Sequence, residues 1–432
     1  MNLGKYSEND LRDELYSKYK ENMYSLIKGR QEIPAWHEEG LPPLSFYLKK
    51  RTYEKINSLL DELECITLIG KEVRLHRNGD STTRIDLLAE NEGESGLTII
   101  ELKKTGKTAR ESFTELLAYS NHFCTLFPLL NEQSIRSVLI SPMDTRVVRD
   151  AYLQELFVNN KNVIALTPKV ENDEISSLEI HYPSDNYFNW YANNIFADEN
   201  FVVLYCEIPL LEGWIDVEEE YSSPNKWSAE ALNSISNHVA QGLERAGLSS
   251  MVYARQRLKE HADLYYGSPN AIIIVTQNPY KSMNLQVDNG IISSSNEDRS
   301  KEIQYLYDQL EGVDDFAIES FLSGFENQLI KLAKQFISES LMFESNNTTE
   351  KIEPHIEMPE WFSFKRNMIE AVVCHNHKIY TTGMIRDLYQ AFLEHAYSTD
   401  MDLSKYSYGE FHKFLRVWLF LEGFSYEDEG DF

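Results

Sequence analysis

Apolar residues along this chain occur as short continuous runs that give way to stripes at helical spacing. The runs that read as β-strands are Cys65 to Ile69 with Val73 to His76, Arg84 to Ala89, Leu97 to Leu102, Ile135 to Ile140 and Val163 to Thr167. Between the third and fourth of these regions, Phe113, Leu116, Leu117, Ser120 and Phe123 recur at helical spacing and predict a helix over about 108–124. Strands interrupted by a helix predict an α/β fold, with a mixed sheet flanked by helices.

Two of the predicted strands carry acidic residues. Side chains alternate across a strand, so Glu101 and Lys103 share one face, and pairing with the preceding strand brings Asp86 beside Glu101. Two adjacent carboxylates repel, which favours a shared proton or a bound cation. Mg²⁺ prefers oxygen ligands, can lower the pKa of a bound water, and leaves Lys103 to orient that water or stabilise negative charge. The pattern indicates a magnesium-dependent phosphodiesterase, although a Glu and a Lys on one strand face also occur on ordinary solvated surfaces.

The span from Thr83 to Ala89, followed by Ile99-Ile100-Glu101-Leu102-Lys103-Lys104, resembles the PD-(D/E)XK nuclease superfamily, in particular its RecB-like and NucS-type branches. The similarity covers about residues 44–170, with Ile85 at the position of the family's usual proline. It implies a restriction-endonuclease-like core and hydrolysis of phosphodiester bonds. It also implies Mg²⁺ or Mn²⁺ bound by Asp86, Glu101 and the main chain at Leu102.

Members of these branches often carry a Gln-x-x-x-Tyr motif on the next helix and a further acid on a helix before the first strand. Tyr119 fits the motif here, whereas Glu115 replaces the glutamine and adds negative charge near the proposed metal. The resemblance implies catalytic roles for both. On the predicted helix Leu44 to Leu63, Glu54 lies 32 residues before Asp86 and is the matching further acid, with an exposed pair to a neighbouring lysine as the alternative.

The overall charge of −28 is unusual for a protein that contacts nucleic acid, because phosphates attract Lys and Arg. Its distribution changes the picture. From Leu44 to Arg110 there are twelve Lys and Arg against eleven Asp and Glu. The candidates for nucleic-acid contact near the acids are Arg84, Lys104, Lys107 and Arg110. The acidic remainder is either an ordinary soluble surface or a docking surface for a basic protein or a second copy of the chain.

The pattern divides the chain into four parts. Residues 1–43 form a helical arm, 44–185 the nuclease domain, and 186–345 a second α/β domain. After a polar linker, residues 358–432 form a helical domain of winged-helix or assembly type, with helices capped by Thr382 and Ser407.

No apolar stretch is long enough to predict a membrane-spanning helix. The four cysteines are widely spaced, as expected for reduced thiols in a cytoplasmic protein.

Two functions from different classes follow. The first is a metal-dependent nuclease, with DNA as the expected substrate and prokaryotic genome defence or DNA repair as the setting that the family resemblance implies. The second is a catalytically degenerate nuclease fold that serves as a binding or assembly module.

Overall fold

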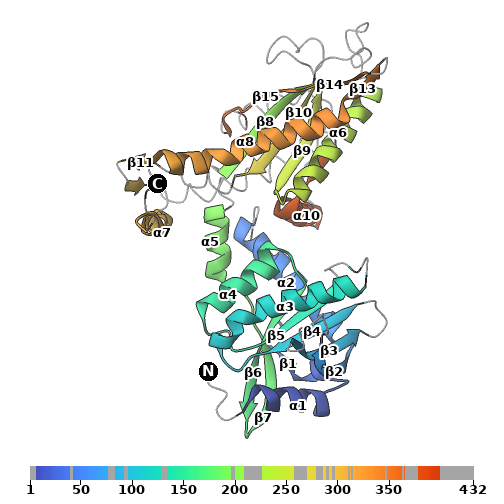
Figure 1. The fold of residues 1–432 in the computed structure, drawn as a ribbon, viewed down its shortest axis with the longest axis vertical. Helices are drawn as coiled ribbons and strands as arrows, with labels where there is room; N and C mark the ends of the chain where they lie inside the picture. The colour runs from blue at the N-terminus through green and yellow to red at the C-terminus, as the bar shows by residue number, and fades with distance from the viewer. Residues whose placement is uncertain are drawn as a thin grey trace. The chain divides into compact units, whose positions relative to one another are not determined.

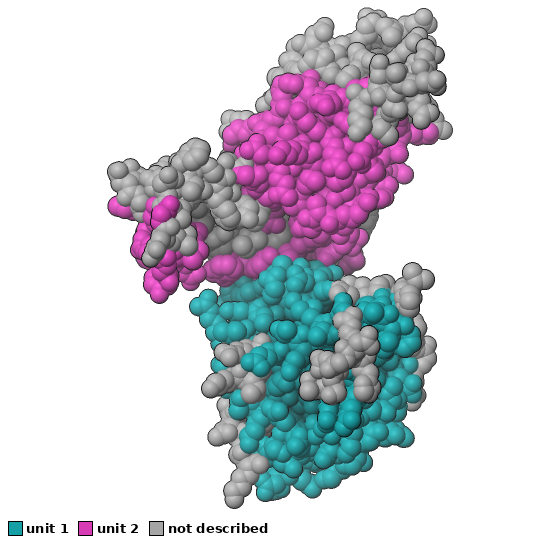
Figure 2. Space-filling model, viewed as in Figure 1, with its two compact units in different colours: residues 1–37, 48–187 teal, residues 38–47, 188–432 magenta. Residues whose placement is uncertain are grey.

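The chain forms two compact units in the computed structural model (Figure 2). The first unit contains Met1–His37 and Leu48–Tyr187, and the second contains Glu38–Tyr47 and Phe188–Phe432. The structure describes residues 6–38, 42–75, 83–91, 96–127, 130, 134–195, 200–208, 226–256, 270–278, 286–288, 291–293, 297–309, 312, 315–345, 348–361, 364 and 378–398.

A seven-stranded mixed sheet organises the first unit (Figure 1). Its strands are β1 (Ile27–Lys28), β2 (Ile66–Arg74), β3 (Arg84–Asn91), β4 (Leu97–Leu102), β5 (Ile135–Ile140), β6 (Val163–Glu171) and β7 (Glu174–Ile180). They are ordered β1-β7-β6-β5-β4-β3-β2. β4, β5 and β6 are parallel, whereas β2, β3 and β4 form an antiparallel meander and β6 pairs antiparallel with β7. The predicted α/β class with a mixed sheet is confirmed.

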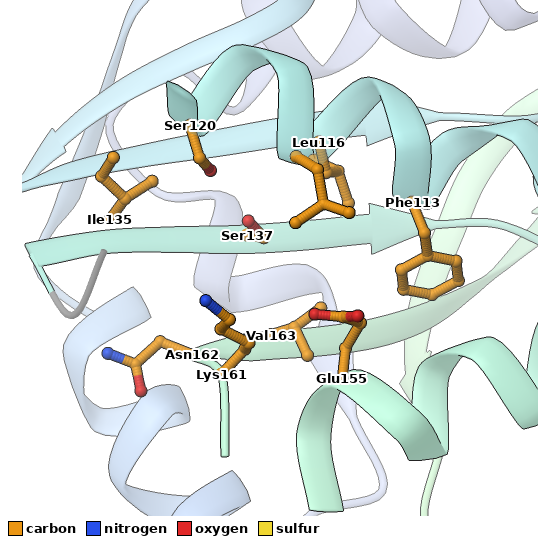
Figure 3. A pocket seen from close by; sticks show the side chains of 10 residues that line it. Phe113, Leu116, Ser120, Ile135, Ser137, Glu155, Lys161, Asn162 and Val163 are labelled. Atoms are coloured by element: carbon orange, nitrogen blue, oxygen red, sulfur yellow. The ribbon is translucent and has the colours of Figure 1, made fainter. Parts of the chain in front are cut away.

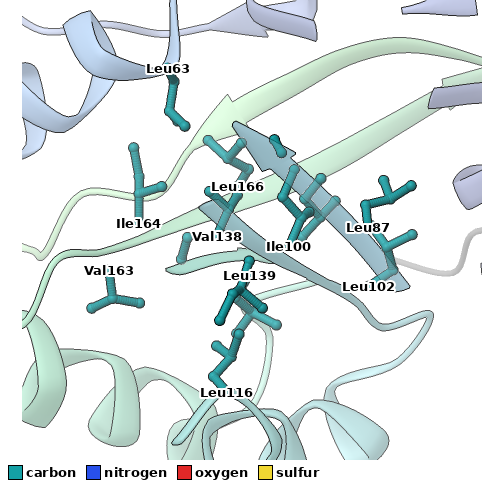
Figure 4. Close-up of a cluster of buried hydrophobic side chains, with 14 of the residues drawn as sticks. Leu63, Leu87, Ile100, Leu102, Leu116, Val138, Leu139, Val163, Ile164 and Leu166 are labelled. Atoms are coloured by element: carbon teal, nitrogen blue, oxygen red, sulfur yellow. The ribbon is translucent and has the colours of Figure 1, made fainter. Parts of the chain in front are cut away.

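Helices cover both faces of this sheet. The helical elements are α1 (Glu8–Lys18), η1 (Met23–Leu26), α2 (Leu44–Leu63), α3 (Gly106–Leu126), α4 (Arg146–Leu153) and the π-helical turn η3 (Gln154–Val158). α5 (Asp185–Ile195) begins in the first unit and continues into the second. Figure 4 shows Leu63 of α2 and Leu116 of α3 on opposite sides of the strands, each next to buried strand residues. Burial on both faces explains why β4 and β5 read as continuous apolar runs instead of alternating ones.

Several elements differ in detail from their sequence patterns. β2 is one strand through the two predicted runs, with a shift in register between Leu68 and Gly70. On α3, Leu117 was expected in the inward stripe but is exposed, while Tyr119 is buried. The buried face of α3 therefore includes Tyr119 in place of Leu117. A tyrosine ring can pack in a core as an aliphatic side chain does, provided that its hydroxyl has a hydrogen-bond partner. α4 begins directly after Thr145.

The predicted N-terminal arm is part of the first unit. α1 places Leu11 and Leu15 in the same buried cluster as the strands of the seven-stranded sheet. A capping box fixes its start, because Ser7 accepts from the Asp10 amide and Asp10 accepts from the Ser7 amide.

The second unit is built on a five-stranded antiparallel sheet. Its strands are β8 (Phe201–Ile208), β9 (Ser250–Gln256), β10 (Asn270–Gln277), β15 (His355–Glu357) and β16 (Ile379–Thr381), in the order β15-β8-β10-β9-β16. One face packs against α6 (Lys226–Arg245) and α8 (Asp315–Ser340) through Leu232, Leu329 and their neighbours. The remaining elements are β11 (Gln286–Asp288), β12 (Ile291–Ser293), α7 (Glu297–Tyr307), β13 (Met342–Ser345), β14 (Thr348–Lys351) and α10 (Gly383–Ser398).

The expected boundary at residue 358 falls between two strands of this five-stranded sheet, β15 and β16. The helix expected after Thr382 is present as α10, whereas the helix expected after Ser407 lies outside the described residues. No helix among the described ones is long and apolar enough to cross a membrane. Cys65, Cys124 and Cys206 are free thiols, and Cys374 lies outside the described residues.

Replacing Ile100, a fully buried residue of β4, with alanine should lower the stability of the first unit. Leaving a cavity between two packed faces typically costs about 2–5 kcal/mol. Hydrogen exchange of the β3, β4 and β5 amides, read by mass spectrometry, would show the loss. Replacing Ile33, which is 44% exposed, with alanine should change the free energies of opening obtained from this exchange by less than about 0.5 kcal/mol. Equal effects of the two variants would contradict the assignment of Ile100 to the core.

Candidate active site

The antiparallel pairing of β3 with β4 brings the two acids together. Leu87 lies opposite Ile100 in this ladder, so the next position along the strands sets Asp86 against Glu101 on the same face. One Asp86 oxygen, Oδ2, accepts the Leu102 main-chain N–H at 3.0 Å. The predicted juxtaposition of Asp86 and Glu101 is therefore present, and a hydrogen bond fixes it across the strand pair.

Lys103 joins this pair at the carboxyl end of β4. Its ammonium lies 2.5 Å from Glu101 Oε1 and 2.7 Å from Glu115 Oε2 on α3. The Glu101 side chain is only 3% exposed, and its second oxygen, Oε2, has no hydrogen-bond donor among the described residues. A buried carboxylate oxygen without a donor is costly unless a proton or a cation occupies that side.

Burial controls the protonation of these groups. It raises the pKa of Glu101 to about 9, and repulsion from Asp86 acts in the same direction. For Lys103, burial lowers the pKa, but the attraction of Glu101 and Glu115 outweighs this and holds the pKa above its usual value. Burial, followed by the nearby carboxylates, also raises the pKa of Tyr119. At neutral pH and without a cation, burial therefore favours a proton on Glu101, while the Glu115 carboxylate favours the charged form of Lys103.

Tyr119 ties α3 to the strand that carries Asp86. Its side chain is buried, and its hydroxyl donates to the Arg84 main-chain carbonyl at 2.8 Å. Glu115, one turn earlier on α3, contacts Lys103. The two positions singled out on this helix thus both lie at the paired acids, since residues four apart share a helix face.

Two residues of α1 reach the same place, and sequence reasoning missed both. Arg12 lies 3.3 Å from Asp86, and Glu8 accepts the Lys104 main-chain N–H at 2.7 Å. Arg12 and Asp86 are 74 positions apart in the sequence, so only the tertiary packing of α1 brings them together. Glu8 and Arg12 are four residues apart on a helix that begins after the capping residue Ser7, so the sequence could place them on one helix face. It could not indicate which strand this face would contact.

Glu54 is elsewhere. It forms an ion pair with Lys50 at 3.6 Å on its own helix, and the carboxylates that act on Glu101 are those of Asp86 and Glu115. The adjacent Lys55 donates to Asn160, just before β6, at 2.8 Å. Because β4, β5 and β6 are parallel, this is the opposite end of the strands from Glu101. The structure therefore does not bring Glu54 to the paired acids, and its predicted alternative, a pair with a neighbouring lysine, describes its surroundings.

The four basic candidates have different surroundings. Arg84 is half-exposed and lies 3.6 Å from Glu72 on β2, and Lys104 directly follows Lys103. Lys107 and Arg110 lie in the first turns of α3, but their side chains are outside those that the structure describes.

The donor set suits a hard divalent cation in part. Asp86 and Glu101 offer carboxylate oxygens, and the Leu102 carbonyl is the main-chain oxygen between Glu101 and Lys103. The unpartnered Glu101 oxygen is where a cation would replace the proton. Within the described part of the chain, no three His, Cys, Asp or Glu side chains are grouped to hold a metal. Such an ion would therefore need water or substrate oxygens to complete its shell, as Mg²⁺ commonly does.

A small cavity lies under α3, away from the acids (Figure 3). Leu116, Ser137 and Val163 line it, together with Lys161 and Glu155, and its volume is about 40 Å³. That space accommodates a few water molecules and no nucleotide. Ser137 and Val163 are near the start of β5 and β6, so the cavity is no extension of the candidate site.

Replacing Glu101 with glutamine should change how stability depends on pH. With a folded pKa near 9 against an ordinary value near 4.5, the folded protein holds a proton that the unfolded chain loses. The contribution of Glu101 to wild-type stability therefore falls as pH rises from about 4.5 to 9, by at most about 1.4 kcal/mol per pH unit, and the variant lacks this fall. Urea unfolding in a chelator at pH 5.5, 7 and 8.5 should show the variant gaining on wild type as pH rises.

Glu174→Gln is the matched control. Its ion pair with Lys18 lowers the pKa of Glu174, so its contribution is already complete at pH 5.5 and stays constant above it. The difference between this variant and wild type should not change across the three pH values. A flat difference for Glu101→Gln as well would contradict the buried, protonated state of Glu101.

No family model matches the chain, and the comparisons with curated proteins and with solved structures likewise find no match. A function can therefore be inferred from the chemistry of the residues that the fold brings together.

Proposed function

We propose that this protein is a metal-dependent nuclease that hydrolyses phosphodiester bonds at the site formed by Asp86, Glu101 and Lys103. The observation that carries the proposal is the buried Glu101 oxygen without a donor, beside a second carboxylate and a charged lysine. Three such groups at one end of a strand pair supply what phosphoryl transfer needs, namely cation ligands and a fixed positive charge.

Each residue has a chemical part in this proposal. Mg²⁺ or Mn²⁺ held by Asp86, Glu101 and the Leu102 carbonyl would lower the pKa of a water and neutralise charge on the phosphate. Lys103 bridges Glu101 and Glu115, which raise its pKa, and its ammonium would donate a hydrogen bond to the attacking water or to the phosphoryl oxygens. Glu115 keeps the lysine in place, and Tyr119 holds α3 against β3.

The order of elements supports a PD-(D/E)XK-type core as part of the proposal. β2, β3 and β4 form the antiparallel meander, α3 follows, and β5 returns parallel to β4. This order agrees with what the resemblance of the motif implies. A fold alone does not specify a chemical reaction, so the proposal depends mainly on the side chains of Asp86, Glu101 and Lys103.

DNA is the substrate that we propose, in an endonucleolytic reaction. The basic residues that would contact its phosphates are Arg84 and Lys104, with Lys107 and Arg110 at the start of α3. A cytoplasmic setting in prokaryotic genome defence or DNA repair belongs to the same proposal, and so does a basic protein or a second copy docking on the acidic remainder.

One observation favours a second candidate, a degenerate nuclease fold that binds or assembles without cleaving. The charges are paired within the protein, since Lys103 bridges Glu101 and Glu115 while Arg12 contacts Asp86. A site that has lost its metal would need such internal neutralisation. Calorimetric titration with Mn²⁺ separates the candidates. The nuclease should bind Mn²⁺ and lose this binding in Glu101→Ala, whereas the degenerate fold needs no cation at this site.

The nuclease proposal predicts that Asp86→Ala, Glu101→Ala and Lys103→Ala each reduce cleavage by about 100-fold or more, because each removes a cation ligand or a transition-state charge. Linear and circular duplex DNA, single-stranded DNA and RNA would be incubated with the full-length variants and Mg²⁺ or Mn²⁺. Thermal unfolding would confirm that each variant is folded.

Glu174→Ala, an exposed acid paired with Lys18, is the control and should cleave like wild type. Glu54→Ala should resemble this control, because Glu54 pairs with Lys50 at the other end of the sheet. Wild-type cleavage by a folded Glu101→Ala would refute the site. Absence of Mn²⁺ binding together with no cleavage of any of the four substrates would favour the binding module.

A further inference from the structure

Arg12 places a buried positive charge against one of the two candidate metal ligands. Its Nη1 lies 3.3 Å from Asp86 Oδ1, and its Nη2 lies 3.4 Å from Glu72 Oε1. Nη2 also donates to Asn9 Oδ1 at 2.9 Å. The Arg12 side chain is 10% exposed, and its Nε has no acceptor among the described residues. A guanidinium enclosed to this degree is part of the architecture of the site and not a solvated surface group.

The packing of α1 determines where this guanidinium lies. Leu11 and Leu15 are fully buried in the core of the first unit, which fixes the rotation of the helix, and Arg12 follows Leu11 directly. An ion pair between Asp13 and Lys71 of β2, at 2.9 Å, holds the next residue. The core packing of α1 therefore fixes the backbone position from which the Arg12 side chain reaches Asp86.

Glu72 completes the arrangement from β2. Its φ of +47° is in the left-handed region, which non-glycine residues seldom adopt. The strand is irregular just before it, at Leu68 and Gly70. From there the Glu72 carboxylate contacts both Arg12, at 3.4 Å, and Arg84, at 3.6 Å. Three segments distant in sequence thus form an alternating row of charges that ends at Asp86.

We propose that Arg12 is a positioning residue of this site, acting through Asp86, so that α1 completes the metal-binding arrangement. The inference rests on the proposed metal-dependent function and adds a residue to it. Asp86 is held at both oxygens, because Oδ2 accepts from the Leu102 amide while Oδ1 faces Arg12. A carboxylate fixed in this way cannot rotate, and its remaining lone pairs stay available for a cation shared with Glu101.

The same charge also repels a cation, so two effects with opposite signs compete. Glu72 lies as close to Arg12 as Asp86 does and offsets much of its charge. Partners that orient metal ligands typically contribute 10–100-fold in metal affinity or activity. We therefore expect orientation to outweigh repulsion. Arg12 should matter for its planar fork, which spans Asp86, Glu72 and Asn9, and a lysine cannot reproduce it.

The test measures Mn²⁺ affinity by calorimetry on the full chain, and the Mg²⁺ dependence of cleavage, for Arg12→Gln and Arg12→Lys. Both should weaken Mn²⁺ binding by about 10-fold or more and raise the Mg²⁺ concentration needed for half-maximal cleavage. Asn9→Ala keeps every charge and removes one contact of the fork, so it should act in the same direction with a smaller effect. If thermal unfolding shows that the Arg12 variants do not fold, Asn9→Ala alone tests the inference.

Arg146→Gln is the charge-matched control, because Arg146 is exposed and pairs with Asp150 on α4. It should bind Mn²⁺ like wild type. Unchanged affinity in folded Arg12→Gln and Asn9→Ala would overturn the inference, and so would tighter binding in Arg12→Gln, which would make Arg12 a competitor of the metal. If wild type binds Mn²⁺ but cleaves nothing, the proposed function fails while the affinities still decide the role of Arg12. If wild type binds no Mn²⁺, both inferences fail.

Discussion

Burial of the Glu101 carboxylate is the interaction on which the rest of the site depends. A carboxyl group enclosed between β4 and α3 cannot be left as a bare anion, because the cost of desolvation is several kcal/mol. It must share a proton, pair with a base, or coordinate a cation. The fold provides the first two directly, through a raised pKa and through Lys103, and leaves one oxygen open for the third. The surrounding residues follow from this requirement: Glu115 balances the lysine, and Tyr119 closes α3 over the strands.

The site is also the point where elements far apart in sequence are joined. β3 and β4 bring the acids, α3 brings Glu115 and Tyr119, and α1 brings Arg12 and Glu8. The two helices are therefore connected through charged groups at one end of the strand pair, in addition to their apolar contacts. A change in the position of α1 would reach Asp86 through the Arg12 guanidinium and the Lys104 main chain through Glu8.

The sequence predicted the parts of this arrangement that depend on local pattern. Alternation along β3 and β4 was sufficient to place Asp86 beside Glu101, and helical spacing placed Glu115 and Tyr119 on one face. It could not say which helix covers which end of the sheet. Glu54 was expected at the acids because the family resemblance implies a further acid on the preceding helix, whereas Glu54 pairs with Lys50 and the adjacent Lys55 contacts Asn160 before β6. Arg12 was missed because its relation to Asp86 exists only after α1 has packed. In the second unit, β15 and β16 are three residues each, too short to give a periodic signal, and pairing with longer strands is what defines them.

The charge balance of the site connects its two states. Four acids, Asp86, Glu101, Glu115 and Glu72, face three bases, Lys103, Arg12 and Arg84. With all seven ionised the group carries one net negative charge, and a proton on Glu101 brings it to zero. In the proposed nuclease, a divalent cation that replaced this proton would change the balance to one net positive charge, which a phosphodiester would neutralise. Proton and metal would then be alternative ways to satisfy the same buried oxygen, and the metal-bound state would be the one with a net attraction for a phosphate. On this argument the acidity of the remaining chain need not oppose nucleic-acid binding, because the charge that a substrate meets at the site depends on the cation held there.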